Sequence, residues 1–151
     1  MDNWIQVKGV VKVGHGVASG KSNNPRFPAG TITMQKASFQ ERGLNLDDYY
    51  LGTINLSIAP LQYKIKQAKY TFRQVKWSNS NPAEDFSFFD CRIIVGDQQP
   101  INGLIYYPHP ETKPEHFQPP DILEIMSSFI ENLHYGSEVI IEVNPQQIEI
   151  S

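Results

Sequence analysis

Short segments of β-strand character, separated by turns, constrain the fold of this chain more than any other feature. Runs such as residues 4–13, 52–58 and 137–143 alternate apolar with polar side chains or are rich in Val and Ile, and Gly or Pro residues separate them. About six or seven such runs occur, and only two segments have helical spacing. Numerous strands with few crossover helices favour an antiparallel barrel over a doubly wound sheet, which needs a helix between most strands.

Several further stretches complete the predicted strands. Residues 63–77 alternate and are rich in basic side chains, which predicts one long strand or two short ones. Residues 86–95 and 101–108 are apolar strands joined by a tight connection, Gly-Asp-Gln-Gln-Pro. The last eight residues are expected to form a tail or an edge strand.

Two helices are predicted. The first runs from Gln35 to Arg42, and Gly43 is expected to stop it. The second covers residues 121–133, where Asp121 is a suitable N-cap and Glu124 follows three residues later, as in a capping box. Its apolar residues recur at helical spacing: Ile122, Ile125, Met126, Phe129, Ile130 and Leu133. We therefore expect a mainly β, closed barrel of six to seven strands, with one packed C-terminal helix and a second short helix.

Composition narrows the class of protein. The chain has 151 residues, 40% of them hydrophobic, which suits one domain, residues 1–151, with one core. Charged residues make up 19% and the formal net charge is −3, so the chain lacks the basic excess typical of nucleic-acid-binding proteins. No run of about 18 apolar residues predicts a membrane helix. We expect neither a nucleic-acid partner nor a membrane partner.

The cysteine and histidine residues suit a reducing cellular compartment and do not indicate a metal site. The single cysteine, Cys91, lies in an apolar run and is expected to be a small buried side chain. One cysteine cannot form an internal disulfide, which suits a reducing cytoplasm. Residues 1–10 show no secretory signal, and the four histidines lack the spacing of a zinc site. We expect a cytoplasmic protein.

The stretch Tyr-Tyr-Leu-Gly-Thr-Ile-Asn-Leu-Ser-Ile, residues 49–58, contains an unusual polar pair. Its alternation predicts a strand with Ile54, Leu56 and Ile58 on one face and the polar residues on the other. Asn is uncommon in strands because its amide favours turns. Thr53 and Asn55 therefore present a hydroxyl and an amide side by side, just after Gly52.

The order of motifs along the chain resembles the archaeal-type, CTP-dependent riboflavin kinases. A first strand runs into Gly-Val-Ala-Ser-Gly-Lys-Ser-Asn, followed by Gly-Thr-Ile-Asn-Leu-Ser-Ile and then by the segments 91–108 and 121–143. The resemblance spans roughly residues 7–143 and lies in the order of elements rather than in one long motif. It implies a small cradle-loop barrel that phosphorylates riboflavin to FMN, with CTP as donor and Mg²⁺ as cofactor.

The same resemblance implies a set of site residues. Thr53 and Asn55 would hold Mg²⁺, and their oxygens are the hard ligands that this ion prefers. Ser19, Gly20 and Lys21 would form the phosphate loop, where backbone N–H groups can bind an anion. Gly52 would allow close approach of a phosphate to the backbone, and Glu124 would be the catalytic acidic residue.

Other interpretations of the same residues remain open. Thr53 and Asn55 could begin a solvated strand, and Glu124 could serve only to cap its helix. The segment Lys-Ser-Asn-Asn-Pro-Arg-Phe-Pro after the phosphate loop differs from the family pattern. It favours an alternative function, a non-catalytic module that binds a flavin, a nucleotide or a protein. The nucleotide, the exact acceptor and the oligomeric state stay open.

Overall fold

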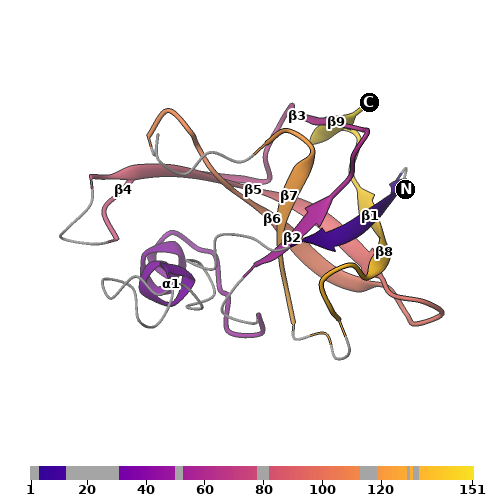
Figure 1. The fold of residues 1–151 in the computed structure, drawn as a ribbon. Coiled ribbons are helices and arrows are strands. Elements are labelled where there is room, and N and C mark those ends of the chain that lie inside the picture. Colours follow the sequence, from indigo (N-terminus) through magenta and orange to yellow (C-terminus); the bar gives the residue numbers. More distant parts are fainter. Residues whose placement is uncertain are drawn as a thin grey trace.

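The computed structural model describes residues 4–12, 31–49, 53–77, 82–112, 119–128, 130 and 133–151. In these ranges the chain forms a mainly β fold with one helix beside it (Figure 1). The elements in order are β1 (Ile5–Lys12), α1 (Thr31–Glu41), β2 (Ile54–Ser57), β3 (Tyr63–Ile65), β4 (Tyr70–Val75), β5 (Glu84–Ile94), β6 (Ile101–Pro108), β7 (Ile122–Ser127), β8 (Glu138–Val143) and β9 (Ile148–Ile150).

Six of the strands close into an antiparallel barrel. Their order around the barrel is β5-β6-β7-β2-β1-β8, and β8 returns to pair with β5. This closure confirms the predicted small barrel. The strand β4 lies outside it, paired with β5, while β3 and β9 form a separate two-stranded sheet. The last residues therefore form an edge strand, one of the two predicted options.

The strand β5 is long enough to belong to two parts of the molecule. Its C-terminal residues 91–94 pair with β8 and close the barrel. Its N-terminal residues 84–88 pair with β4 instead, and β6 accompanies both halves over residues 86–93. The first half of β5, with β4 and the end of β6, therefore forms a protruding sheet that leaves the barrel (Figure 1).

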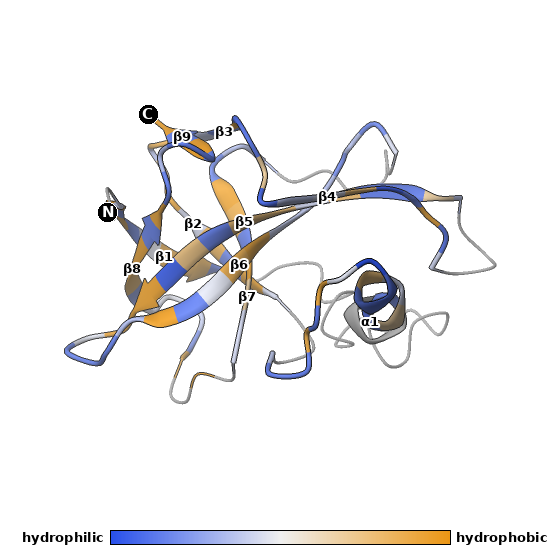
Figure 2. Cartoon of the chain, turned by 180° about the vertical axis from the view of Figure 1, so that it is seen from behind, coloured by the Kyte–Doolittle hydropathy of each residue, from blue (hydrophilic) through white to orange (hydrophobic). Residues whose placement is uncertain are grey.

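Alternation along the strands separates two sets of buried side chains, and the change of hydropathy from residue to residue is visible along β5 (Figure 2). One set fills the barrel, and we name it the barrel core. It consists of Val7, Val11, Leu56, Ile58, Phe89, Cys91, Ile93, Ile105, Leu123, Ile125, Ile130, Val139, Ile141, Val143 and Ile148. The burial of Cys91, at 2% exposure, confirms the prediction for that residue, and burial raises the pKa of its thiol.

The second set lies on the outer wall of the barrel and the protruding sheet, under α1, and we name it the outer core. It consists of Phe39, Leu44, Leu46, Phe72, Val75, Trp77, Phe86, Phe88, Leu104, Tyr106 and Met126. The ring of Phe39 packs edge-on against Phe86 and Phe88, with centroids 5.0 and 5.2 Å away. The helix thus covers the apolar outer face that would otherwise meet water.

The predicted short helix is confirmed as α1, and its end follows from local chemistry. Gly43 has a φ of 99°, a left-handed conformation that glycine adopts without strain. The N–H of Leu44 donates to the carbonyl of Phe39, and the N–H of Gly43 donates to that of Gln40. This pair of bonds is a Schellman motif, and it brings Leu44 and Phe39 together in the outer core.

The predicted C-terminal helix over residues 121–133 is wrong, because its first half is the strand β7. β7 lies between β6 and β2, with Leu123 and Ile125 in the barrel core and Met126 in the outer core. A strand buried on both faces is a continuous apolar run, and such a run can match helical spacing by chance. Glu124 is therefore not the third residue of a helix, and its capping-box interpretation fails.

The basic segment 63–77 resolves into the two short strands β3 and β4. In the part of the chain that the structure describes, no helix is long and apolar enough to cross a membrane.

Candidate functional site

The two predicted metal ligands, Thr53 and Asn55, lie next to and on β2, on the outer wall of the barrel. Leu56 points into the barrel core, so Asn55 points outward, as the sequence pattern predicts. Asn55 is paired with Lys12 of β1 on one side and with Glu124 of β7 on the other. Side chains of directly paired residues share a face, so Lys12, Asn55 and Glu124 form a row across three strands.

Thr53 adjoins this row and is in direct contact with Glu124, so we count it as part of the row. The hydroxyl of Thr53 donates a hydrogen bond to Oε1 of Glu124, with 3.3 Å between the oxygens. Glu124 is 6% exposed, so its carboxylate is almost removed from water. Thr53 and Asn55, predicted from one segment, and Glu124, predicted from another, are thus neighbours. The correction of the helix leaves this grouping intact, because a strand places Glu124 opposite Asn55.

The helix α1 contributes a second polar pair close to Glu124. The hydroxyl of Tyr106 on β6 donates to Oε1 of Gln35 on α1 over 2.8 Å, and both side chains are buried. Burial, and then the negative charge of Glu124, raise the pKa of Tyr106. The phenol therefore stays protonated and can act as a donor. Gln35 lies one helical turn before Phe39, so the outer core holds this pair in position.

The predicted phosphate loop cannot be compared with this geometry. Ser19, Gly20, Lys21 and Gly52 lie outside the described residues.

The donor set of the row suits a hard cation. The described residues hold no group of three or more His, Cys, Asp or Glu side chains that could enclose a metal ion. The row instead offers the Thr53 hydroxyl, the Asn55 amide and the Glu124 carboxylate. Mg²⁺ takes oxygen ligands and keeps several waters or phosphate oxygens, so a few protein oxygens are sufficient. The oxygen donors present are of the type that fits Mg²⁺.

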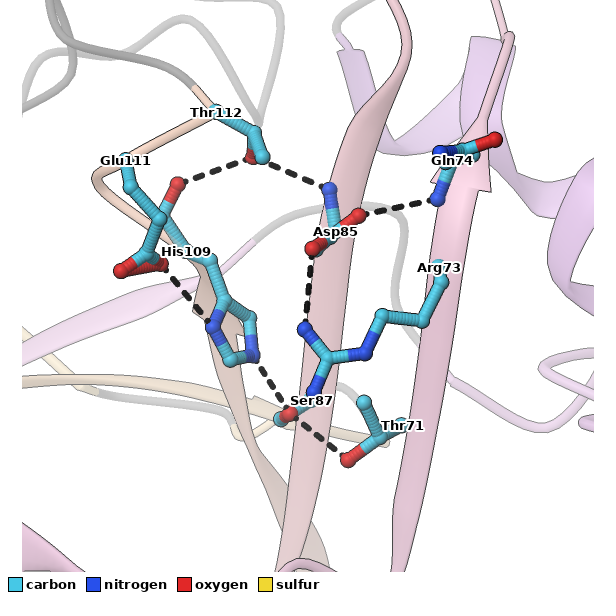
Figure 3. A network of polar contacts seen from close by, with 8 residues as sticks. All are labelled: Thr71, Arg73, Gln74, Asp85, Ser87, His109, Glu111 and Thr112. Atoms are coloured by element: carbon cyan, nitrogen blue, oxygen red, sulfur yellow. Dashed lines mark hydrogen bonds and ion pairs between the residues drawn. The ribbon is translucent and has the colours of Figure 1, made fainter.

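A second polar network lies on the face of the protruding sheet opposite Phe86 and Phe88, which pack under α1. Figure 3 shows its residues. The Ser87 hydroxyl lies 2.7 Å from Nε2 of His109, whose Nδ1 lies 3.2 Å from Oε1 of Glu111. This order of serine, histidine and acid is that of a hydrolase triad. Ser87, however, is only 2% exposed and is also hydrogen-bonded to Thr71 over 2.9 Å. A substrate carbonyl has no access to the Ser87 oxygen, so we interpret this series of hydrogen bonds as structural and not catalytic.

The rest of the second network supports an irregularity in β4. Pairing between β4 and β5 shifts register between Phe72 and Val75, and Gln74 has a φ of 53°. Asp85 accepts a hydrogen bond from the N–H of Gln74 over 2.9 Å and forms an ion pair with Arg73 at 3.0 Å (Figure 3). The carboxylate therefore binds an N–H group at the point where the ladder is irregular.

Comparison with known proteins adds no family to these observations. The chain matches none of the protein-family models compared, and no curated protein is significantly similar to it.

Sequence reasoning missed Lys12 as a member of the row, and Gln35 with Tyr106 as a polar pair near it. Alternation along β1 and β6 predicts which way Lys12 and Tyr106 point. It does not predict which residue lies opposite which, and the pairing of Lys12 with Asn55 is what places Lys12 in the row.

Proposed function

We propose that the chain is a nucleotide-dependent phosphotransferase of the riboflavin-kinase type. It would transfer the terminal phosphoryl group of a nucleoside triphosphate, CTP in the family it resembles, to riboflavin and give FMN. The observation that carries this proposal is the convergence of Thr53, Asn55 and Glu124 on one wall of the barrel. The resemblance assigns these residues to the metal and to catalysis, although they come from segments about 70 residues apart.

Each residue has a role in the proposed reaction that suits its chemistry. Thr53 and Asn55 would hold Mg²⁺, which neutralises charge on the donor phosphates when bound. Glu124 would orient the primary hydroxyl of the acceptor and accept its proton as the oxygen–phosphorus bond forms. The bond between the terminal phosphorus and its bridging oxygen breaks, and the nucleoside diphosphate leaves. Positioning and charge neutralisation supply most of the catalysis in such transfers, so a modest base is sufficient.

The burial of the site is consistent with these roles. Thr53 donates to Glu124, which orients the carboxylate, and the buried Tyr106 is close enough for the charge of Glu124 to raise its pKa. Electrostatic interactions are stronger where water is excluded, so a carboxylate at 6% exposure can discriminate between positions of a bound hydroxyl. Asn55 is paired with Glu124 on one side and with the exposed Lys12 on the other.

Product formation tests the proposal. We would incubate the protein with riboflavin, Mg²⁺ and each of CTP, ATP, GTP and UTP, and measure FMN by chromatography. We expect product with at least one nucleotide. Glu124→Gln and Asn55→Ala should each lower kcat/KM by about 100-fold or more, the range for a general base or a metal ligand. Ser57→Ala is the matched control, since Ser57 lies on the same outer face of β2 but is paired with Ile122, and its activity should be unchanged.

A folded protein that gives no FMN with any nucleotide would contradict the proposal. Riboflavin fluorescence then separates the remaining interpretations. Quenching on titration with the protein would favour a flavin-binding module without catalysis. Equal loss of activity in Ser57→Ala and Asn55→Ala would show that the row acts through stability, not through the reaction.

A further inference from the structure

Lys12 occupies a position beside the candidate site that nothing in the proposed reaction has yet used. It is the last residue of β1 and is paired with Asn55 in the antiparallel register. Val11, its neighbour in the chain, points into the barrel core, so Lys12 points outward on the same wall as Asn55 and Glu124. Its side chain is exposed.

The row therefore has opposite charges at its two ends. Glu124 lies on β7 and Lys12 lies on β1, with Asn55 between them on β2. Neighbouring strands are about 4.8 Å apart, so the two backbones are separated by about 10 Å. Among the described residues, none forms an ion pair with Lys12. Its ammonium group is a cation that faces the candidate site across a single amide side chain.

We propose that Lys12 binds the phosphate chain of the nucleotide, while Thr53 and Asn55 would hold the metal on the side of the row where Glu124 lies. This inference rests on the proposed function for the identity of the ligand, a nucleoside triphosphate with Mg²⁺. The charges of such a ligand match the row, because the cation lies next to the carboxylate and the phosphate oxygens lie next to the ammonium group. A lysine offers three N–H donors to phosphate oxygens, and such charge-assisted hydrogen bonds are the strong ones.

Inorganic tripolyphosphate with Mg²⁺ is the probe, because it carries the phosphate chain without a base. Calorimetric titration of the full chain would compare the wild type with Lys12→Gln, Lys12→Arg and Lys8→Gln. Lys8 is the matched control: it is exposed, lies on the same outward face of β1 and is paired with Ile140 of β8 instead of with the row. We expect Lys12→Gln to raise the Kd by about tenfold or more. Lys8→Gln should change the Kd by less than about twofold, because it removes only a charge at long range. Lys12→Arg should retain most of the affinity, because the positive charge is kept.

Each outcome decides the inference separately from the kinase activity. Equal losses in Lys12→Gln and Lys8→Gln would mean that only general charge matters, and the inference would be wrong. It would also be wrong if the wild type did not bind tripolyphosphate, even if FMN were formed. Binding that depends on Lys12 in a protein that makes no FMN would support the anion site and contradict the proposed kinase.

Discussion

The barrel core and the outer core are built from different kinds of side chain. Among its described residues the barrel core is almost wholly Val, Ile and Leu, with Phe89 as the one large ring. The outer core is dominated by Phe, Tyr and Trp rings that meet in tilted and edge-on contacts. Branched aliphatic side chains suit the interior of a six-stranded barrel, where opposite walls are close. Large rings suit the wider gap between a helix and a sheet.

The two cores differ also in how the chain builds them. The barrel core needs only strands that pair with their neighbours around one closed sheet. The outer core needs α1, the loop after it and β4 to meet on one wall. The strands β5 and β6 contribute to both, since Phe88 faces the outer core and Phe89 the barrel core. We infer that the two cores unfold together, and the following variants test this comparison.

The largest expected effect is that of Phe39→Ala in the outer core. Phe39 is fully buried and contacts three other rings, so its removal should lower the free energy of unfolding by about 3–5 kcal/mol. Phe89→Ala, in the barrel core, is the matched comparison, because Phe89 is also almost fully buried. Urea denaturation followed by circular dichroism should show one transition in both variants, shifted to lower urea.

Two separate transitions would contradict the shared role of β5. If Phe39→Ala lowered the stability of α1 alone, the helical part of the circular dichroism signal would be lost at low urea. The barrel would then unfold in a second transition, at the same urea concentration as in the wild type. The outer core would then be an independent layer that folds onto a stable barrel.

The difference between the cores also explains what the sequence could and could not predict. Alternation in β1 and β2 marks strands with one wet face: β1 was predicted as a strand, and β2 was predicted with its faces correct. β7 was missed because Met126 and Glu124 are covered on the outside while Leu123 and Ile125 are buried inside. Whether an outer layer covers a wall depends on segments far away in the chain, which local spacing does not report.

The candidate site shows the same limit. The resemblance singled out Thr53, Asn55 and Glu124, and alternation correctly placed Asn55 on the polar face of β2. The pairing of Asn55 with Glu124 depends on register between strands that are distant in sequence, so spacing alone could not predict it. The network around His109 was missed for the same reason, since Ser87 lies on β5 and His109 directly follows β6.

Gly103→Ala tests the place where the two cores meet. A Cβ atom at Gly103 would lie 2.7 Å from the carbonyl oxygen of Met126 and 3.3 Å from Sγ of Cys91. The carbonyl belongs to the neighbouring strand and cannot move away easily, so we expect a loss of about 1–3 kcal/mol. Thermal unfolding of Gly103→Ala against Asn102→Ala, an exposed neighbour on the same strand, measures it. Equal melting temperatures would mean that β6 and β7 can separate slightly without cost.

Ser87→Ala tests the polar face of the protruding sheet, opposite the outer core. The variant leaves Nε2 of His109 without its partner at a buried site, which should cost about 1–3 kcal/mol. Thr71→Val removes the other hydroxyl of the same hydrogen bond, but Thr71 is exposed, so water can replace it and the loss should be smaller. Chemical denaturation of both variants gives the comparison. A larger loss in Thr71→Val would contradict the burial argument.

The smallest expected effect concerns Asp85, at the register shift in β4. The N–H of Gln74, followed by the Arg73 side chain, lowers the pKa of Asp85 below its ordinary value. A carboxyl group whose pKa is lower in the folded state stabilises the protein above the unfolded pKa of about 3.9, and this contribution is lost as the pH falls through the folded pKa. Arg73 is mostly exposed, so the contribution should be under about 1 kcal/mol.

Asp85→Asn keeps an oxygen for the N–H of Gln74 and removes the charge. Melting temperatures between pH 7 and pH 2.5 should therefore fall less steeply in the variant than in the wild type, and the two curves should approach each other at the acid end. Parallel curves would mean that the carboxylate acts only as a hydrogen-bond acceptor. The irregularity in β4 would then need an acceptor oxygen in the right position but no charge. In that respect it would resemble the other face of the same sheet, where apolar packing stabilises the strands without charge.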